Sequence, residues 1–318
     1  MAVYTPLNTR QLAGLIAHYD VGDLISAKGI AEGISNSNWL IETTRARFVL
    51  TMYEKRIDDA DLPFFLGLLN HLCARNCPVP ATIHDRTGAA FRSIGGKTVA
   101  LIEYLPGTSP DTPSPAEARS VGEALARIHL AAMDYDGNRP NPLSPAHSLS
   151  ILTRGAAKWR NDLGLNLDPL LRQTAGVVEC WPQTLPTSIV HTDLFPDNVL
   201  MLGDRVTGLI DFYFAARDMM AYDLAVTHAA WCFDTSGTRF DAAVSRALIT
   251  GYEQIRPLSD RERAALPILA QGACLRFVTS RAEDWGDTPA GAKVLRKDPM
   301  DFVRRWDFYA AQGDTAFA

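Results

Sequence analysis

The sequence is 318 residues long, and 47% of its residues are hydrophobic while 21% are charged. These proportions are ordinary for a globular protein and exclude a disordered or fibrous chain. The length is more than one hydrophobic core usually supports, so we expect two domains or lobes. The formal net charge of -5 offers no broad electrostatic attraction to nucleic acid or to an anionic membrane.

The cysteines and the N-terminal segment indicate in which cellular compartment the protein works. The five cysteines are scattered and lack the paired spacing of a zinc site or a disulfide framework. The first residues, MAVYTPLNTRQLAGLI, have no basic head followed by an apolar stretch, and no later segment reaches about 18 unbroken apolar residues. We therefore expect a cytoplasmic protein with reduced thiols and no membrane or nucleic-acid partner.

The first third of the chain predicts an antiparallel sheet with two helices. Leu12, Ile16 and Tyr19 have the spacing of one helix face, and Asn8 or Thr9 can cap this helix. Residues 26–53 indicate three strands separated by polar turns, because WLIET and FVLTMY are rich in strand-forming residues. A helix opened by Asp61 and two short strands near 81–84 and 97–105 complete this unit.

The rest of the chain predicts a mainly helical unit. The stretch PGTSPDTPSPAE, rich in Pro, Ser and Thr, favours a linker after Leu105. We expect an α+β protein with an antiparallel-sheet N-terminal lobe, residues 1–105, and a mainly helical C-terminal lobe, residues 106–318. Helical patterns occur at 115–132, 241–255, 260–283 and 299–311.

The segment HTDLFPDN, residues 191–198, gathers polar groups between two apolar runs. The following sequence, NVLMLGDRVTGLIDF, contains Gly203 and Asp204 between two strand-like runs and predicts a tight hairpin. With a two-residue turn, period-two alternation puts Asn198 and Asp211 on one face, about 7 to 8 Å apart. One amide and one carboxylate suit Mg²⁺ when a nucleotide supplies further oxygens.

Asp193 precedes this hairpin and has a different predicted part. Near a metal-bound phosphate, its carboxylate can orient a hydroxyl group and accept the proton of that hydroxyl. Taken singly, Asp and Asn residues near turns usually bond their own backbone. The joint spacing of Asp193, Asn198 and Asp211 favours phosphoryl transfer to an alcohol.

The pattern H-x-D-x-x-x-x-N, followed thirteen residues later by I-D-F, resembles the protein-kinase-like superfamily in its branch of aminoglycoside and choline kinases. The resemblance implies a bilobal kinase-like fold with Asp193 as catalytic base and with Asn198 and Asp211 as Mg²⁺ ligands. It makes His191 a packing and hydrogen-bonding support. Asp223, in AYDLA, would anchor a helix against the catalytic loop.

The same resemblance predicts an ATP phosphate-binding turn in EGISNSN, residues 32–38. A glycine there lets the backbone approach closely, and amides and hydroxyls can bond phosphate oxygens. The expected contacts are Gly33, Ser35, Asn36, Ser37 and Asn38.

The chain departs from this family at Thr51, where a phosphate-binding Lys or Arg is usual. Lys55, or alternatively Lys28, could supply the missing charge, although either can equally be a surface lysine. The order of elements implies an adenine-binding hinge formed by Glu103, Tyr104 and Leu105.

Longer stretches narrow the resemblance. Along nearly its whole length, the sequence is similar to bacterial homoserine kinases of the aminoglycoside-phosphotransferase-like type. The stretches that carry this similarity include KGIAEGISNSNWLIET, FVLTMYEKR, HTDLFPDNVLMLGD and GYEQIRPL. The resemblance implies ATP-dependent phosphorylation of L-homoserine to O-phospho-L-homoserine in threonine biosynthesis, by a monomer or homodimer. A small zwitterion needs a cation and carboxylate or aromatic partners. The C-terminal lobe offers Trp231, Asp234, Arg276, Arg281, Glu283, Asp284 and Trp285, none of which the sequence assigns individually.

Three alternatives remain open. A kinase for choline, an aminoglycoside or another amino alcohol would keep the chemistry and change the acceptor pocket. A non-catalytic pseudokinase would bind nucleotide without turnover, and Thr51 favours this reading. A Mg²⁺ phosphohydrolase would release phosphate without an acceptor.

Overall fold

The computed structural model describes residues 5, 7–30, 36–54, 57–163, 168–287 and 297–318. The chain divides into two compact units, Met1–Gly107 with Thr207–Tyr213, and Thr108–Val206 with Phe214–Ala318. We call them unit 1 and unit 2. The first division falls close to the expected boundary at residue 105, whereas residues 207–213, expected in the C-terminal lobe, group with unit 1.

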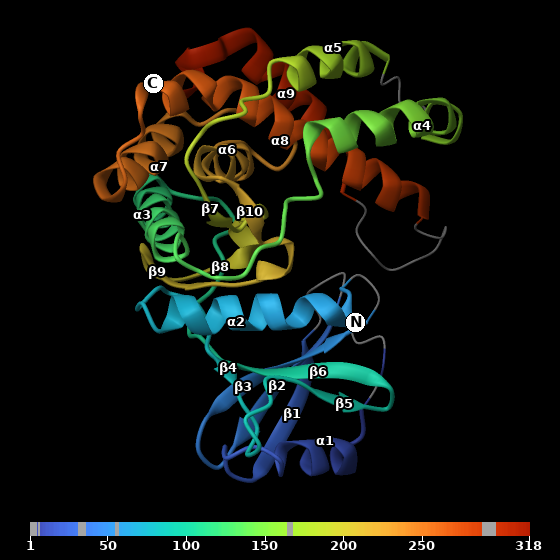
Figure 1. The fold of residues 1–318 in the computed structure, drawn as a ribbon, viewed down its shortest axis with the longest axis vertical. Helices are drawn as coiled ribbons and strands as arrows, with labels where there is room; N and C mark the ends of the chain where they lie inside the picture. The colour runs from blue at the N-terminus through green and yellow to red at the C-terminus, as the bar shows by residue number, and fades with distance from the viewer. Residues whose placement is uncertain (1–4, 6, 31–35, 55–56, 164–167, 288–296) are drawn as a thin grey trace. The chain divides into compact units, whose positions relative to one another are not determined.

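Unit 1 is built on a six-stranded antiparallel sheet (Figure 1). Its path is β1-β2-β3-β6-β4, with β5 also paired to β6. The strands are β1 (Leu24–Ile30), β2 (Asn36–Thr43), β3 (Arg47–Tyr53), β4 (Thr82–Ile83), β5 (Arg92–Ile94) and β6 (Lys97–Glu103). Helices α1 (Thr9–Ile16) and α2 (Leu62–Cys73) lie on opposite sides of this sheet. The predicted meander and both predicted helices are thus confirmed.

Alternation along the strands gives the sheet two different faces. Trp39, Leu50 and Val99 pack with Leu12 and Ile16 of α1 in one buried core. Side chains at the intervening positions point to the other side of the sheet, because successive residues in a strand alternate.

We call that other side the Thr51 face. Asn38 is the Cα partner of Thr51, and Asn36 is the partner of Tyr53, so all four side chains belong to it. Lys28 pairs with Leu40 and shares the same side.

Unit 2 is mainly helical, with the helices predicted from 115, 241, 260 and 299 onward present as α3, α7, α8 and α9. A short antiparallel pair, β7 (Thr187–Val190) and β10 (Ala216–Met219), leads into the loop that contains Asp193. The helices are α3 (Pro115–Ala131), α4 (Pro145–Leu163), α5 (Asp168–Glu179), α6 (Met220–Trp231), α7 (Ala242–Ile255), α8 (Asp260–Asp287) and α9 (Met300–Gln312).

Two glycines allow α3 and α7 to pack with their backbones in close contact. A Cβ atom on Gly122 would lie 2.1 Å from the carbonyl oxygen of Leu248, and one on Gly251 would lie 2.1 Å from that of Arg119. Larger residues at either position would push the helices apart. This packing brings His129 near the end of α3 against Tyr252 of α7, their ring centroids 5.7 Å apart.

The predicted hairpin is present as β8 (Val199–Leu202) and β9 (Arg205–Leu209). Gly203 in its turn has φ 57°, a conformation that glycine adopts without strain. Within the described ranges, no helix combines the length and hydropathy that a bilayer crossing requires.

Candidate active site

The loop after β7 adopts an unusual backbone conformation at its second residue. Thr192 has φ 63°, which is rare for a β-branched residue and is usually found where the surroundings impose it. The Asp223 carboxylate accepts hydrogen bonds from the N–H groups of His191, at 2.7 Å, and Thr192, at 2.6 Å. The Thr192 hydroxyl donates to the carbonyl oxygen of Phe214 at 3.0 Å. These hydrogen bonds fix the backbone conformation of the two residues that precede Asp193.

Asp223 is the centre of a buried polar network. His129 Nε2 lies 2.9 Å from Asp223 Oδ2, and His129 Nδ1 lies 2.8 Å from the Tyr252 hydroxyl. Burial alone would raise the pKa of Asp223, but hydrogen bonds from His129 and from the His191 backbone lower it below its ordinary value. The carboxylate therefore stays ionised, and the predicted anchoring of α6 to the loop is confirmed.

The carboxylate of Asp193 is partly exposed and has a charged neighbour. Its side chain is 19% exposed, and its Oδ1 lies 3.4 Å from Nη2 of Arg276. Burial raises the pKa of the Asp193 carboxyl above its ordinary value, while the nearby charges of Arg276 and Lys297 act in the opposite direction. Asp193 thus has the environment expected of a base that must accept a proton.

Arg276 reaches the loop from α8. It donates through Nη1 to the carbonyl oxygen of Thr192 as well as through Nη2 to Asp193. Its side chain is only 4% exposed, and the guanidinium carbon lies 4.6 Å from the ring centroid of Phe277 and 5.3 Å from that of Phe214. A rigid, planar cation is therefore fixed between the strained residue and the predicted base.

Asn198 ends the short 3₁₀ helix η2 (Pro196–Asn198). Its Nδ2 donates to the carbonyl oxygen of Asp193 at 2.8 Å, which fixes the orientation of the amide. The amide oxygen, the atom that a metal ion would take, is not used in that bond. Asn198 is thus tied to the same loop as Asp193, within unit 2.

Asp211 follows β9 and belongs to unit 1. Neither Asp211 nor Asn198 lies in a strand of the hairpin, and Asp211 has φ 64°. Simple alternation therefore does not place these two side chains on one face, because the alternation ends with the strands. Their convergence with Asp193 remains a prediction.

The Thr51 face carries part of the expected nucleotide-binding surface. Asn36, 7% exposed, has a side-chain oxygen without a hydrogen-bond partner among the described residues. Asn38 lies on the same face, beside Thr51. By contrast, Ser37 lies on the α1 face, and its hydroxyl donates to Glu54 at 2.7 Å.

Thr51, where the family usually has a cation, shares its sheet face with Tyr53. The Tyr53 hydroxyl lies 2.9 Å from that of Tyr213. Tyr213 also packs edge-on against Phe65 of α2, with ring centroids 5.7 Å apart. Gly33, Ser35 and Lys55 lie outside the described residues.

The expected hinge lies at the end of β6. The Glu103 carboxylate accepts from the N–H of Ala81 at 3.0 Å, which fixes the strand end. Tyr104 lies under the guanidinium of Arg47, 4.3 Å from the ring centroid. Leu105 follows β6, half-buried. The side chains of Glu103 and Tyr104 thus have structural partners, as expected where only the backbone would meet adenine.

Several residues considered for the acceptor have structural partners in unit 2. Trp231 Nε1 donates to the carbonyl oxygen of Leu194 at 2.9 Å and so supports the loop that contains Asp193. Arg281 pairs with Asp301 at 2.9 Å. Asp234 accepts hydrogen bonds within its own loop, from the N–H groups of Thr238 and Arg239. Glu283 and Asp284 are exposed, and Trp285 is half-buried.

The pattern of the phosphotransferase enzyme family matches residues 26–258, which include the whole constellation from Asn36 to Asp223. The chain belongs to this family.

Sequence relatives of this phosphotransferase are named homoserine kinase. The one from Afipia carboxidovorans is 44% identical over 309 residues, covering 97% of this chain and 94% of its own length. The one from a Caulobacter species is 46% identical and covers 96% and 95%.

Solved structures share the fold at low identity. An amicoumacin kinase in complex with AMP-PNP and Ca²⁺ has a TM-score of 0.71 at 12% identity, covering 97% of this chain and 94% of its own. A choline kinase from Cryptosporidium parvum has a TM-score of 0.68 at 13% identity, covering 97% and 96%. The chain therefore has the bilobal, protein-kinase-like fold that the motifs implied.

Proposed function

We propose that the protein transfers a phosphoryl group from ATP to the hydroxyl of L-homoserine, giving O-phospho-L-homoserine for threonine biosynthesis. The observation that carries the proposal is the loop at Asp193. A base with a raised pKa lies on a strained turn, is paired with Arg276, and occurs in a chain closely related to proteins named homoserine kinase.

Asp193 would orient the acceptor hydroxyl and take its proton as the hydroxyl oxygen bonds to the γ-phosphorus of ATP, while the bond from that phosphorus to the β-phosphate oxygen breaks and ADP leaves. Arg276 holds one carboxylate oxygen, so the other oxygen of Asp193 is the one that can face the acceptor. The Asp223 carboxylate, which accepts from the His191 and Thr192 N–H groups, would hold the loop backbone in place when the acceptor binds.

Asn198 and Asp211 would hold Mg²⁺. The two residues fit a hard cation, since each brings an oxygen donor and neither is a thiol or imidazole. When bound, the ion would neutralise charge on the phosphate oxygens. The orientation of Asn198, with its amide nitrogen already engaged, supports this part.

The nucleotide would bind along the Thr51 face. We retain Gly33, Ser35, Asn36 and Asn38 for the phosphates, and we leave out the Ser37 side chain because its hydroxyl is engaged by Glu54 on the α1 face. The backbone of Glu103, Tyr104 and Leu105 would meet adenine. Lys55 or Lys28 would supply the cation that Thr51 lacks.

One assay tests the function. ATP consumption with Mg²⁺ is measured against L-homoserine, L-serine, choline and kanamycin, and the product is identified by mass. We expect a phosphorylated product with L-homoserine and a kcat/KM at least tenfold below it for the others. Acceptor-independent phosphate release, or nucleotide binding without turnover, would instead support the phosphohydrolase or the pseudokinase.

A further inference from the structure

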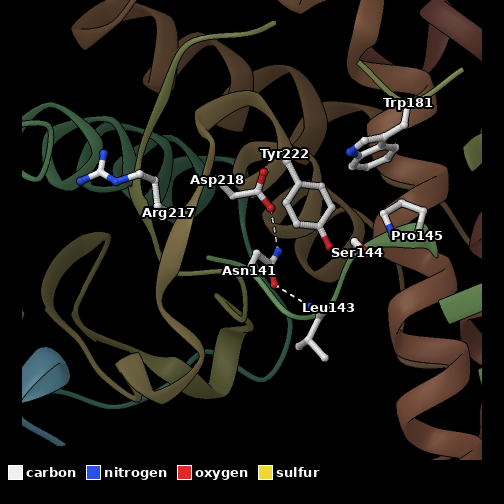
Figure 2. Close-up of a pocket in the computed structure, with 8 residues that line it drawn as sticks. All are labelled: Asn141, Leu143, Ser144, Pro145, Trp181, Arg217, Asp218 and Tyr222. Carbon is white, nitrogen blue, oxygen red and sulfur yellow. Dashed lines mark hydrogen bonds between the residues drawn. The ribbon is translucent and has the colours of Figure 1, made fainter. Parts of the chain in front are cut away.

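A cavity of about 180 Å³ in unit 2 is not part of the catalytic loop (Figure 2). It lies between the segment that leads into α4, strand β10, helix α6 and the indole of Trp181. This space suits a molecule of roughly eight non-hydrogen atoms. The polar and aromatic residues that line it include Asn141, Ser144, Trp181, Asp218 and Tyr222.

The hydroxyl of Tyr222 is the unusual feature of this cavity. Tyr222 is 1% exposed, and its hydroxyl has no hydrogen-bond partner among the described residues. Figure 2 shows this hydroxyl directed toward Ser144. A buried hydroxyl is costly without a partner, so a molecule in the cavity that accepts a hydrogen bond from Tyr222 would be favoured.

Opposite charges are favoured at two ends of the cavity. At one end, Ser144 precedes α4, and its hydroxyl accepts from the N–H of His147 at 3.2 Å. The N-terminus of this 19-residue helix favours a negative group, and the hydroxyls of Ser144 and Tyr222 can donate to one.

At the other end lies the Asp218 carboxylate. Its Oδ2 accepts from Asn141 at 2.7 Å and its Oδ1 from the N–H of Met219 at 2.7 Å, which fixes its position. Burial raises the pKa of Asp218, so an ammonium group beside it would relieve the cost of its charge. The rings of Trp181 and Tyr222, with centroids 5.6 Å apart, form an aromatic wall that also suits an ammonium group.

The cavity walls are fixed by close packing. A Cβ atom on Gly272 of α8 would lie 2.3 Å from the ring of Trp181 and 3.3 Å from Pro145. Glycine at this position therefore lets the indole pack directly on the helix. The aromatic wall is in place before any ligand binds.

The cavity and Asp193 lie at different ends of the β7–β10 pair. Asp218 is the Cα partner of Ser188 near the start of β7, whereas Asp193 follows the end of that strand. Tyr222 directly precedes Asp223, whose carboxylate holds the His191 and Thr192 amides. A ligand here could thus influence the loop without meeting the base.

We propose that this cavity is a second site, separate from the acceptor site, that binds a small zwitterionic amino acid. The ammonium group lies at Asp218, and the carboxylate accepts from the hydroxyls of Tyr222 and Ser144.

The test uses L-2-aminobutyrate, which has both charged groups but no hydroxyl to phosphorylate. Calorimetry on the full chain should resolve two binding steps. One of them should weaken at least tenfold in Tyr222→Phe, which removes the hydroxyl donor, and in Asp218→Asn, which removes the negative charge that pairs with the ammonium group. Asp136→Asn, an exposed carboxylate on the neighbouring segment, is the matched control and should leave both steps unchanged. Butyrate and propylamine, each lacking one charged group, should bind at least tenfold more weakly at the cavity.

The homoserine kinetics separate this proposal from the proposed function. The KM for L-homoserine should stay within about twofold in both variants. A tenfold rise in that KM in both would make the cavity the acceptor site and overturn the second-site proposal, as would calorimetry unchanged by both variants. If the wild-type protein fails to phosphorylate L-homoserine, the proposed function falls while the calorimetry still decides on the cavity.

Discussion

The guanidinium of Arg276 lies 3.4 Å from the carboxylate of Asp193, and the same side chain donates to the Thr192 carbonyl. One buried cation therefore contacts both the strained turn and the carboxylate that we propose as the base. Because the charge of Arg276 opposes the effect of burial, it keeps the pKa of Asp193 lower than burial alone would make it. We therefore expect Arg276 to act on the reaction through Asp193.

Replacing Arg276 should change both the rate and its pH dependence. Arg276→Met removes a neighbour that lowers the pKa of Asp193, so that pKa rises further. A base works only when it is ionised, and the acidic limb of the kcat profile should therefore move to higher pH. We expect kcat to fall by about 10- to 100-fold, with Arg276→Lys restoring the limb more than the rate. Arg261→Met, at an exposed arginine on α8, is the control. If the acidic limb of the kcat profile does not move in Arg276→Met, Arg276 does not set the pKa of Asp193.

Asp193→Ala should remove the proposed base while leaving nucleotide binding intact. We expect kcat to fall by roughly 10² to 10⁴-fold with ATP affinity nearly unchanged, since base catalysis is typically worth that much. Steady-state kinetics and nucleotide binding by calorimetry give the two numbers. Loss of ATP binding with turnover preserved at saturation would assign Asp193 another role.

Asp223→Asn should destabilise the fold and change its response to acid. The lowered pKa of Asp223 means that its ionised form stabilises the protein above the ordinary carboxyl pKa of about 4, and that this contribution is lost as pH falls through the folded-state value. The variant should lose about 3 kcal/mol of unfolding free energy at pH 7, and this difference should shrink toward pH 3.

Urea unfolding at several pH values measures this difference. Asp204→Asn, in the exposed hairpin turn, provides a carboxylate change without buried partners. A difference that stays constant from pH 7 to pH 3 would show that packing rather than the charge of Asp223 matters.

The local signals in the sequence predicted the elements of the site but not its tertiary partners. The hairpin and the anchoring Asp223 follow from motifs of a few residues, whereas Arg276 lies 83 residues from Asp193. Similarly, His129 meets Asp223 across 94 residues, through the packing of α3 beside α6. The spacing of residues along the sequence does not predict such long-range contacts, because they depend on how the helices pack.

Two details of the site depend on local backbone geometry. Ser37 is two residues from Trp39 and shares its buried face, so only the backbone of Ser37 is left for the phosphate contact, which stays a prediction. The expected alternation between Asn198 and Asp211 ignored the strand ends, because Asn198 belongs to η2 and Asp211 has a left-handed backbone. Special backbone conformations of this kind are common at functional sites and weaken periodicity arguments there.

The cation that replaces the usual lysine can be found by paired substitutions. Lys28 shares the Thr51 face, whereas Lys97 pairs with Glu54 at 3.0 Å on the α1 face. We expect the Lys28→Met, Lys55→Met double variant to raise the KM for ATP about tenfold or more, since it removes the charge available to the phosphates. The single variants Lys28→Met and Lys55→Met then show how much of the rise in KM each lysine accounts for. Lys97→Met should leave the KM for ATP unchanged, and an effect in that control alone would exclude both proposed lysines.

The proposed metal ligands can be tested through the Mg²⁺ dependence of the rate. If Asn198 and Asp211 hold one ion, the loss of either side chain should weaken the binding of that ion. We expect Asn198→Ala and Asp211→Ala each to raise the Mg²⁺ concentration needed for half-maximal rate by about tenfold or more.

Because two ligands of one ion do not act independently, the double variant should cost much less than the product of the single effects. Asp197→Asn, an exposed carboxylate beside Asn198 in η2, should leave the Mg²⁺ dependence unchanged. Initial rates measured over a Mg²⁺ titration at a fixed ATP concentration give the half-maximal Mg²⁺ concentration of each variant. Strictly multiplicative effects would mean that the two residues do not share an ion, and the proposed convergence on the nucleotide phosphates would then be wrong.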